Sequence, residues 1–193
     1  MGIFQKSVIK NHLETLDSGQ VEKAYQKYKE IYNSAKIEII KNLKEEEYQD
    51  GFLRDIFVDV LGYILKPNEN YNLVREFKNQ ADSKKADGVI VKISADGSLT
   101  AKAIAVIELK STKTKELKSI TEQAFGYKFN QPDCKYVIIS NFQKLQFYID
   151  YANEYEEFDL FNLQKSEFEL FYLLLNSESI LSDLPLKLIE LHT

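Results

Sequence analysis

Three charged residues of types found in metal-dependent active sites lie at the ends of two apolar runs. Asp87 lies at the start of the run ADGVIVKI, and Glu108 and Lys110 lie at the end of the run LTAKAIAVIEL. Paired carboxylates at short range hold a hard divalent cation such as Mg²⁺ through their oxygens. Such an ion lowers the pKa of a bound water and shields the charge that develops on a phosphate, and a nearby lysine stabilises that charge further.

A hairpin between the two runs would bring the three residues together. The segment SADGS, residues 94–98, contains an Asp-Gly pair that suits a tight turn. In such a hairpin Asp87 lies beside Glu108 and Lys110, and strand alternation puts Glu108 and Lys110 on one face. The same residues also fit a solvated strand end on which Glu108 and Lys110 form an ion pair with each other.

A helix predicted after this strand carries two further candidates. In SITEQAFGYKFN, Gln123 and Tyr127 are four residues apart and share one helix face, with the small Ala124 beside them. They could complete a site at the strand end. The alternatives are an exposed helix glutamine and an aromatic residue that packs in the core.

The predicted order of helices and strands around these residues indicates a mixed α/β domain with one central sheet. Apolar periodicity indicates helices over 20–48, 47–65 and 116–130, and strands over 86–93, 99–109, 134–140 and 144–149. A helix between the strands ending at 109 and 140 suggests a crossover, and so a parallel pair. The chain is expected to continue with a short edge strand over 158–163, a helix over 165–176 opened by Ser166 as N-cap, and a connecting segment over 183–193.

Composition excludes several classes of protein. The 193 residues are 44% hydrophobic, which excludes an intrinsically disordered chain. The net charge is −5, so a protein of this kind would bind DNA only through a local patch or with help from another domain. The single Cys134 fits a reducing, cytoplasmic compartment, and neither a membrane span nor a signal peptide is apparent. The two histidines, His12 and His192, lie near the ends, which disfavours a histidine-based nuclease or a Ser-His-Asp triad.

Taken together, these motifs resemble the PD-(D/E)XK nuclease superfamily in its RecB-like Gln-X3-Tyr form. The resemblance is closer still to the N-terminal endonuclease domain of Type IIG restriction-modification enzymes, which serve bacterial defence. It spans residues 45–187 and is carried by the phrases FLRDIFVDVLGY, KADGVIV, VIELKSTKTKEL, EQAFGYKFNQ, YVIISNFQKLQFYI and LPLKL. The proline that nominally precedes the first aspartate of the pattern is replaced here by Ala86.

The resemblance implies a restriction-endonuclease-like core, a central mixed sheet flanked by helices, that hydrolyses DNA phosphodiester bonds with Mg²⁺ or Mn²⁺. Asp87 and Glu108 would be metal ligands together with the Leu109 carbonyl, and Lys110 would position the attacking water. Gln123 and Tyr127 would shape the site or contact the scissile phosphate.

The family often has one more acidic residue on an early helix, for which this chain offers three neighbouring glutamates. They are Glu45, Glu46 and Glu47, with Glu47 as the first choice. The alternative is an ordinary acidic helix start that lies near the positive end of the helix dipole.

Lysines flank the proposed site in an otherwise acidic chain. Lys113 and Lys115 are expected to bind substrate, while Lys118 and the pair Lys84-Lys85 lie nearby. The alternative is a solvated loop.

The domain organisation expected from the resemblance is one nuclease domain over residues 1–193. It would comprise an N-terminal helical segment (1–44), a catalytic core (45–165) and a C-terminal helix with the start of a linker (166–193). The chain has neither the glycine-rich turn nor the Asn/Asp-Pro-Pro-Tyr/Phe motif of a DNA methyltransferase. Methyltransferase and target-recognition domains are therefore expected beyond Thr193, in a prokaryotic cytoplasm. A transient dimer is expected for double-strand cleavage. The alternative function is a nuclease-fold module that binds DNA or a partner without cleaving.

Overall fold

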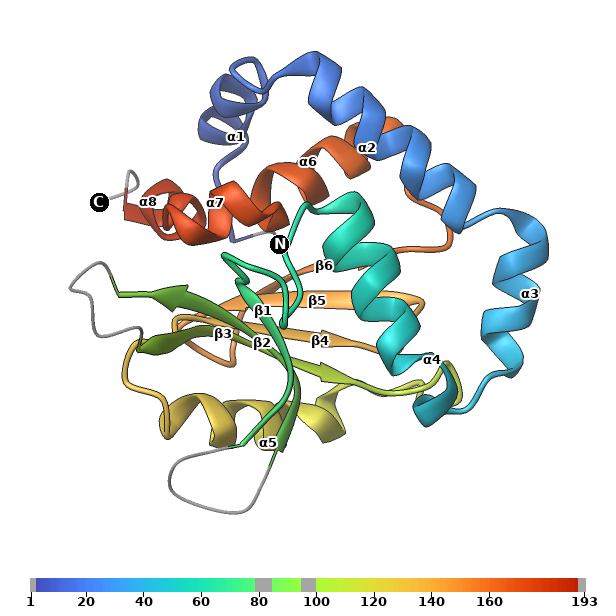
Figure 1. Cartoon of the computed structure of the whole chain (residues 1–193). Coiled ribbons are helices and arrows are strands. Elements are labelled where there is room, and N and C mark those ends of the chain that lie inside the picture. The colour runs from blue at the N-terminus through green and yellow to red at the C-terminus, as the bar shows by residue number, and fades with distance from the viewer. Residues whose placement is uncertain (1–2, 79–84, 95–99, 191–193) are drawn as a thin grey trace.

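A six-stranded mixed sheet forms the centre of the protein. The computed structural model describes residues 3–78, 85–94 and 100–190 (Figure 1). The strands lie in sequence order across the sheet: β1 (Leu73–Lys78), β2 (Lys85–Ile93), β3 (Ala101–Leu109), β4 (Tyr136–Ser140), β5 (Lys144–Ile149) and β6 (Tyr155–Asp159). Neighbouring strands are antiparallel except β3 and β4, which are parallel and joined by α5 (Lys118–Phe129). The expected mixed α/β architecture and the expected crossover are thus confirmed.

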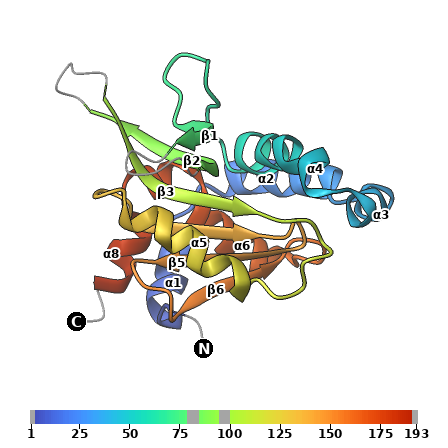
Figure 2. The same cartoon turned by 90° about the horizontal axis from the view of Figure 1, so that it is seen from below.

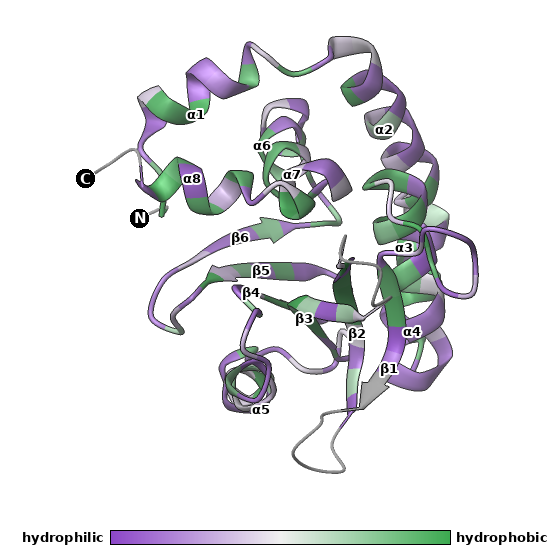
Figure 3. Cartoon of the chain, turned by 60° about the vertical axis from the view of Figure 1, so that its left-hand side comes forward, coloured by the Kyte–Doolittle hydropathy of each residue, from purple (hydrophilic) through white to green (hydrophobic). Residues whose placement is uncertain are grey.

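Helices cover both faces of the sheet (Figures 1 and 2). Helix α5 packs alone on one face, where Val106, Val137 and Ala124 belong to a separate apolar cluster. The remaining helices pack on the opposite face, against residues such as Ile107 and Ile138. Burial on both faces explains why every residue of β4 is buried. In Figure 3 the strands carry green, hydrophobic stretches, whereas the outer strand β6 also shows purple, hydrophilic ones.

The long helix predicted over 20–48 is wrong. The chain forms α2 (Ser18–Ile31) and α3 (Ser34–Asn42) instead, and α4 begins at Glu45. The break has a local cause, because the Asn33 side chain accepts a hydrogen bond from the Lys36 backbone N–H at 3.0 Å and caps α3. In this new helix Ile39 is 60% exposed.

Helix α4 (Glu45–Phe52) continues directly into a π-helical segment, η1 (Leu53–Val60). The helix predicted over 47–65 is confirmed up to Val60, and its residues Phe52, Ile56 and Val60 are buried. It ends five residues earlier than predicted, and Gly62 follows with a φ of +79° that a side chain would disfavour.

One strand was missed and another was misplaced. Strand β1 reads LVREFK, and its charged centre hides the alternation that marks a strand. The edge strand expected over 158–163 is β6, which begins three residues earlier and ends at Asp159. The predicted turn at Asp96-Gly97 lies outside the described residues, although β2 and β3 pair antiparallel as expected.

The C-terminal part is more helical than expected. Helix α6 (Lys165–Leu175) has Gln164 rather than Ser166 as its N-cap, and Ser166 lies inside the helix. It is followed by α7 (Ser177–Leu181) and α8 (Leu184–Glu190). The prediction of a connecting segment over 183–193 is therefore wrong for residues 184–190, which form a helix. This helix packs on the core through Leu188, which is fully buried.

One further helix lies at the start of the described chain. Helix α1 (Lys6–Leu13) precedes α2 and lies close to α6 (Figure 1). None of the described helices is long and apolar enough to cross a membrane.

Candidate metal-dependent active site

The register of β2 and β3 brings Asp87 to the end of β3. Gly88 pairs with Ile107, so the next position along the hairpin sets Asp87 beside Glu108. The Leu109 backbone N–H donates a hydrogen bond of 2.7 Å to Asp87 Oδ2, which ties the carboxylate to the exit of β3. Burial raises the pKa of Asp87, as the largest of several opposing effects.

Glu108 is the most unusual residue of the site because it is a carboxylate that is only 1% exposed. Its Oε2 accepts a hydrogen bond of 3.1 Å from Gln123 Nε2 on α5, whereas its buried Oε1 has no hydrogen-bond partner among the described residues. Burial, and next the charge of Asp87, raise the pKa of Glu108 to about 8. A buried oxygen without a partner costs free energy, so this carboxylate is poised to accept a cation or a proton.

Lys110 pairs with a residue from the opposite side of the site. Its Nζ lies 3.0 Å from Glu45 Oε1 at the start of α4, and its backbone N–H donates to the Ser140 carbonyl at 2.8 Å. The structure has this ion pair in place of the Glu108–Lys110 pair that the sequence left open. Both side chains remain partly exposed, at 27% and 33%.

Glu45 is the early glutamate that faces the site. Glu47, the first choice from the sequence, instead accepts a hydrogen bond of 2.6 Å from the Lys44 backbone N–H and caps α4, and Glu46 is exposed. Glu47 is therefore engaged at the start of its own helix, and Glu45 is the one of the three glutamates that contacts Lys110.

Gln49 is a site residue that the sequence analysis missed. Its Nε2 donates to Asp87 Oδ1 and to Glu45 Oε1, in both cases at 3.1 Å. Gln49 lies one helical turn after Glu45, and this spacing of four residues was the available signal. The bridge joins α4 to β2 across the proposed site.

The two residues of α5 have different surroundings. Gln123 points its amide to Glu108, as described above. Tyr127 is 4% exposed and belongs to the apolar cluster beneath α5, as the packing alternative anticipated. The structure therefore joins Gln123 directly to Glu108 and buries Tyr127 in the apolar core.

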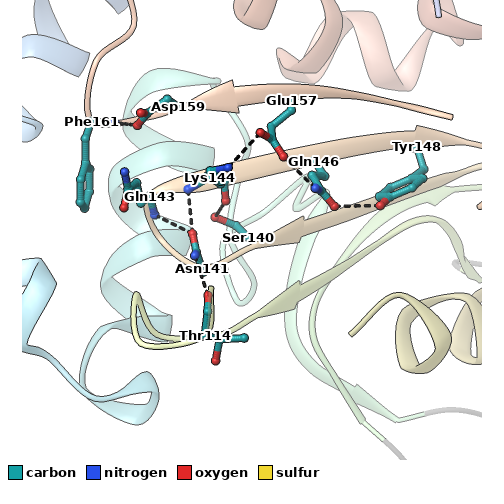
Figure 4. Close-up of polar contacts among 10 residues, drawn as sticks. All are labelled: Thr114, Ser140, Asn141, Gln143, Lys144, Gln146, Tyr148, Glu157, Asp159 and Phe161. Atoms are coloured by element: carbon teal, nitrogen blue, oxygen red, sulfur yellow. Dashed lines mark hydrogen bonds and ion pairs between the residues drawn. The ribbon is translucent and has the colours of Figure 1, made fainter. Parts of the chain in front are cut away.

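The lysines follow β3 in a loop that is tied at two points. The Thr112 hydroxyl donates to the Lys41 carbonyl at 3.1 Å, and Asn141 Nδ2 donates to the Thr114 carbonyl at 2.8 Å (Figure 4). Lys113 and Lys115 are exposed on this loop.

The basic pair before Asp87 has a different outcome. Lys84 lies outside the described residues, and Lys85 pairs with Glu76 at 2.9 Å. We therefore assign no phosphate contact to this pair.

The donor set suits a hard cation bound through few protein ligands. Within residues 3–78, 85–94 and 100–190, no group of three or more Asp, Glu, His or Cys residues could hold a metal ion. Two carboxylates, Asp87 and Glu108, nevertheless meet beside the Leu109 backbone, and one buried oxygen has no partner there. Mg²⁺ commonly takes one or two carboxylates and completes its shell with water and phosphate oxygens, so the residues fit such an ion.

Comparison of the chain with protein-family models, curated proteins and solved structures finds no match.

Proposed function

We propose that the protein is a Mg²⁺-dependent DNA endonuclease domain with a restriction-endonuclease-like PD-(D/E)XK core. The proposal extends to the cleavage part of a Type IIG restriction-modification enzyme, with methyltransferase and target-recognition parts elsewhere in the polypeptide. The observation that carries it is the buried Glu108 carboxylate, whose Oε1 lacks a partner while Asp87 lies beside it. A carboxylate buried only for packing would be expected to have both oxygens satisfied.

Each residue of the site then has a physical role. Asp87, Glu108 and the Leu109 carbonyl would hold Mg²⁺, which supplies positive charge to the phosphate and lowers the pKa of a water molecule. Gln123 orients Glu108, and Gln49 orients Asp87, through the hydrogen bonds that they donate. These contacts fix the two carboxylates before substrate arrives, which lowers the cost of reorganisation during the reaction.

Lys110 acts on the reacting groups. Its ammonium, held by Glu45, positions the attacking water and offsets negative charge on the phosphate. The water oxygen forms a bond to phosphorus while the bond from phosphorus to the 3′ oxygen breaks. The water gives up a proton and the 3′ oxygen gains one, so that the products are a 5′-phosphate and a 3′-hydroxyl. One such site cuts one strand, so a double-strand cut requires two copies or two successive nicks.

The decisive experiment is nicking of supercoiled plasmid with Mn²⁺ at low salt, where unguided DNA binding is strongest. We expect the wild type to nick, and Asp87→Asn and Lys110→Ala to lose at least a hundredfold of that rate. Lys23→Ala, on the exposed face of α2, is the matched control and should retain the wild-type rate.

Two outcomes would count against the proposal. Nicking that survives both site substitutions would place the activity elsewhere or in a contaminant. Metal binding that depends on Asp87, without nicking by any form, would favour the alternative of a nuclease-fold module that does not cleave.

A further inference from the structure

A pocket lies beside the lysine loop, residues 110–117, on the face of the sheet that α5 covers. It has a volume of about 690 Å³ and lies between the first turns of α5 and strands β5 and β6. This volume is within the range of pockets that bind small organic ligands. Lys115, which comes five residues after Lys110, is part of its lining.

Polar groups in the pocket lining are fixed in a row. The Tyr148 hydroxyl donates to Gln146 Oε1 at 2.8 Å, and Gln146 Nε2 donates to Glu157 Oε2 at 2.8 Å (Figure 4). Lys144 pairs with the other oxygen of Glu157 at 3.3 Å. A primary amide has two donor hydrogens and a carboxylate accepts about four hydrogen bonds, so this row keeps polar capacity beyond these contacts.

An aromatic wall borders the same space. The rings of Tyr148 and Tyr155 lie 5.0 Å apart, and Tyr155 is 40% exposed on the edge strand β6. An exposed ring beside fixed hydrogen-bonding groups is the arrangement that stacks a nucleobase and contacts its polar edge. A purely aliphatic ligand would leave the remaining hydrogen-bonding capacity of this row unused.

Charge at the pocket rim is balanced. Lys115 and Lys118 form no ion pair with any residue that the structure describes, and Glu116 and Glu122 also border the pocket. A ligand with a phosphate next to an aromatic base would match two lysines and a tyrosine. Because the net charge of the rim is near zero, we expect stacking to contribute more than the lysines do.

We propose that this pocket binds one unpaired nucleotide of a DNA strand, with its base stacked on Tyr155 and its phosphate beside Lys115 and Lys118. The strand as the source of the nucleotide rests on the proposed function, since Lys115 belongs to the loop that leaves the candidate active site. The pocket and its preference for base plus phosphate do not depend on cleavage.

The test measures binding of a fluorescein-labelled oligothymidylate to the full chain in EDTA at low salt, so that cleavage cannot interfere. We expect Tyr155→Ala to weaken binding about tenfold, as removal of a base-stacking aromatic does. Tyr155→Phe should bind within twofold of the wild type. Lys118→Ala should lower the salt dependence of binding by about one phosphate contact.

Tyr151→Ala is the matched control, since Tyr151 is 75% exposed in the turn before β6 and does not line the pocket. Equal weakening by Tyr151→Ala and Tyr155→Ala, or no binding by the wild type, would overturn the proposal. If free thymidine monophosphate displaces the oligonucleotide at an equal concentration, the pocket does not require a DNA strand. That result would overturn the proposal that the bound nucleotide belongs to a strand.

The two proposals fail separately. Tyr155-dependent binding by a protein that never nicks plasmid would keep the pocket and reject the endonuclease. Nicking that depends on Asp87, together with oligonucleotide binding that is unchanged in Tyr155→Ala, would keep the endonuclease and reject the nucleotide pocket.

Discussion

At the scale of single residues, Glu108 shows how the site departs from ordinary protein chemistry. Its carboxylate is buried beside Asp87, and Lys110, whose positive charge favours the ionised form of Glu108, is itself paired with Glu45. The folded protein therefore favours the protonated form of Glu108, and its pKa rises from 4.5 to about 8. A raised carboxylate pKa means that ionisation of Glu108 opposes folding.

This argument gives the first prediction, on pH and stability. Below pH 4.5 Glu108 is protonated in both the folded and the unfolded chain. As pH rises from there toward about 8, only the unfolded chain loses the proton freely, so the folded state loses on the order of a few kcal/mol. In Glu108→Gln that loss should be absent. Urea unfolding at pH 5, 7 and 9 in EDTA measures it.

Glu46→Gln serves as the control, because Glu46 is exposed on the same acidic helix start as Glu45. It should keep the pH dependence of the wild type. If Glu108→Gln also loses stability between pH 5 and pH 9 as the wild type does, then Glu108 does not have the raised pKa.

At the scale of elements, two helices deliver polar residues to the end of β3. Helix α4 carries Glu45 and Gln49, and α5 carries Gln123. Each helix also contains one glycine, and the surroundings of the two glycines differ. A methyl group at Gly51 would lie 2.7 Å from the Tyr48 ring, whereas nothing lies within 4 Å of one at Gly126.

The second prediction compares alanine at these two glycines. Alanine gains about 1 kcal/mol over glycine inside a helix, so Gly126→Ala should stabilise the protein by up to that amount. Gly51→Ala should instead destabilise it by about 1–3 kcal/mol, because the buried Tyr48 ring must move. Tyr48 also donates a hydrogen bond of 2.8 Å to Asp55, which restrains that movement.

Thermal or urea unfolding of the two variants gives the measurement, and Gly126→Ala is the matched control for helix propensity. Stabilisation by both substitutions would show that Tyr48 relaxes freely and that α4 is not held where the structure has it.

In the molecule as a whole, the functional groups lie together where four neighbouring strands of the sheet begin or end. The start of β2, the ends of β3 and β4 and the start of β5 meet there, because β4 runs parallel to β3 and β5 runs back beside it. Asn141 ties the lysine loop to the turn between β4 and β5 (Figure 4). An ion bound at these strand ends would contact residues from both β2 and β3. It would therefore stabilise the folded state relative to the unfolded chain.

The third prediction follows from mass action. A metal ion that binds only the folded state, present at about a hundred times its dissociation constant, adds about 2.7 kcal/mol of stability. For a chain of this length that corresponds to a rise in Tm of about 5–10 °C. Calorimetry with Mg²⁺ or Mn²⁺ should show this rise in the wild type and in Glu46→Gln, and not in Asp87→Asn. An equal rise in all three proteins would mean that the ion binds elsewhere.

Those parts of the fold that depend on local pattern can be predicted from the amino-acid sequence alone. Alternating and apolar runs marked β2 to β5, the apolar spacing marked α5, and the helix between two strands indicated the parallel pair. Asp87, Glu108 and Lys110 were also found from the sequence, because hairpin pairing makes the start of one strand the neighbour of the end of the next.

Which side chains face one another across elements depends on the tertiary packing and could not be predicted from the sequence. Glu45 rather than Glu47 reaches Lys110 because the cap of α4 engages Glu47, and Gln49 meets Asp87 only because α4 packs over the end of the sheet. The pocket beside Tyr155 likewise joins segments far apart in the sequence. Such contacts depend on how helices dock on the sheet, and a period of 3.6 residues fixes a helix face but not the partner that it meets.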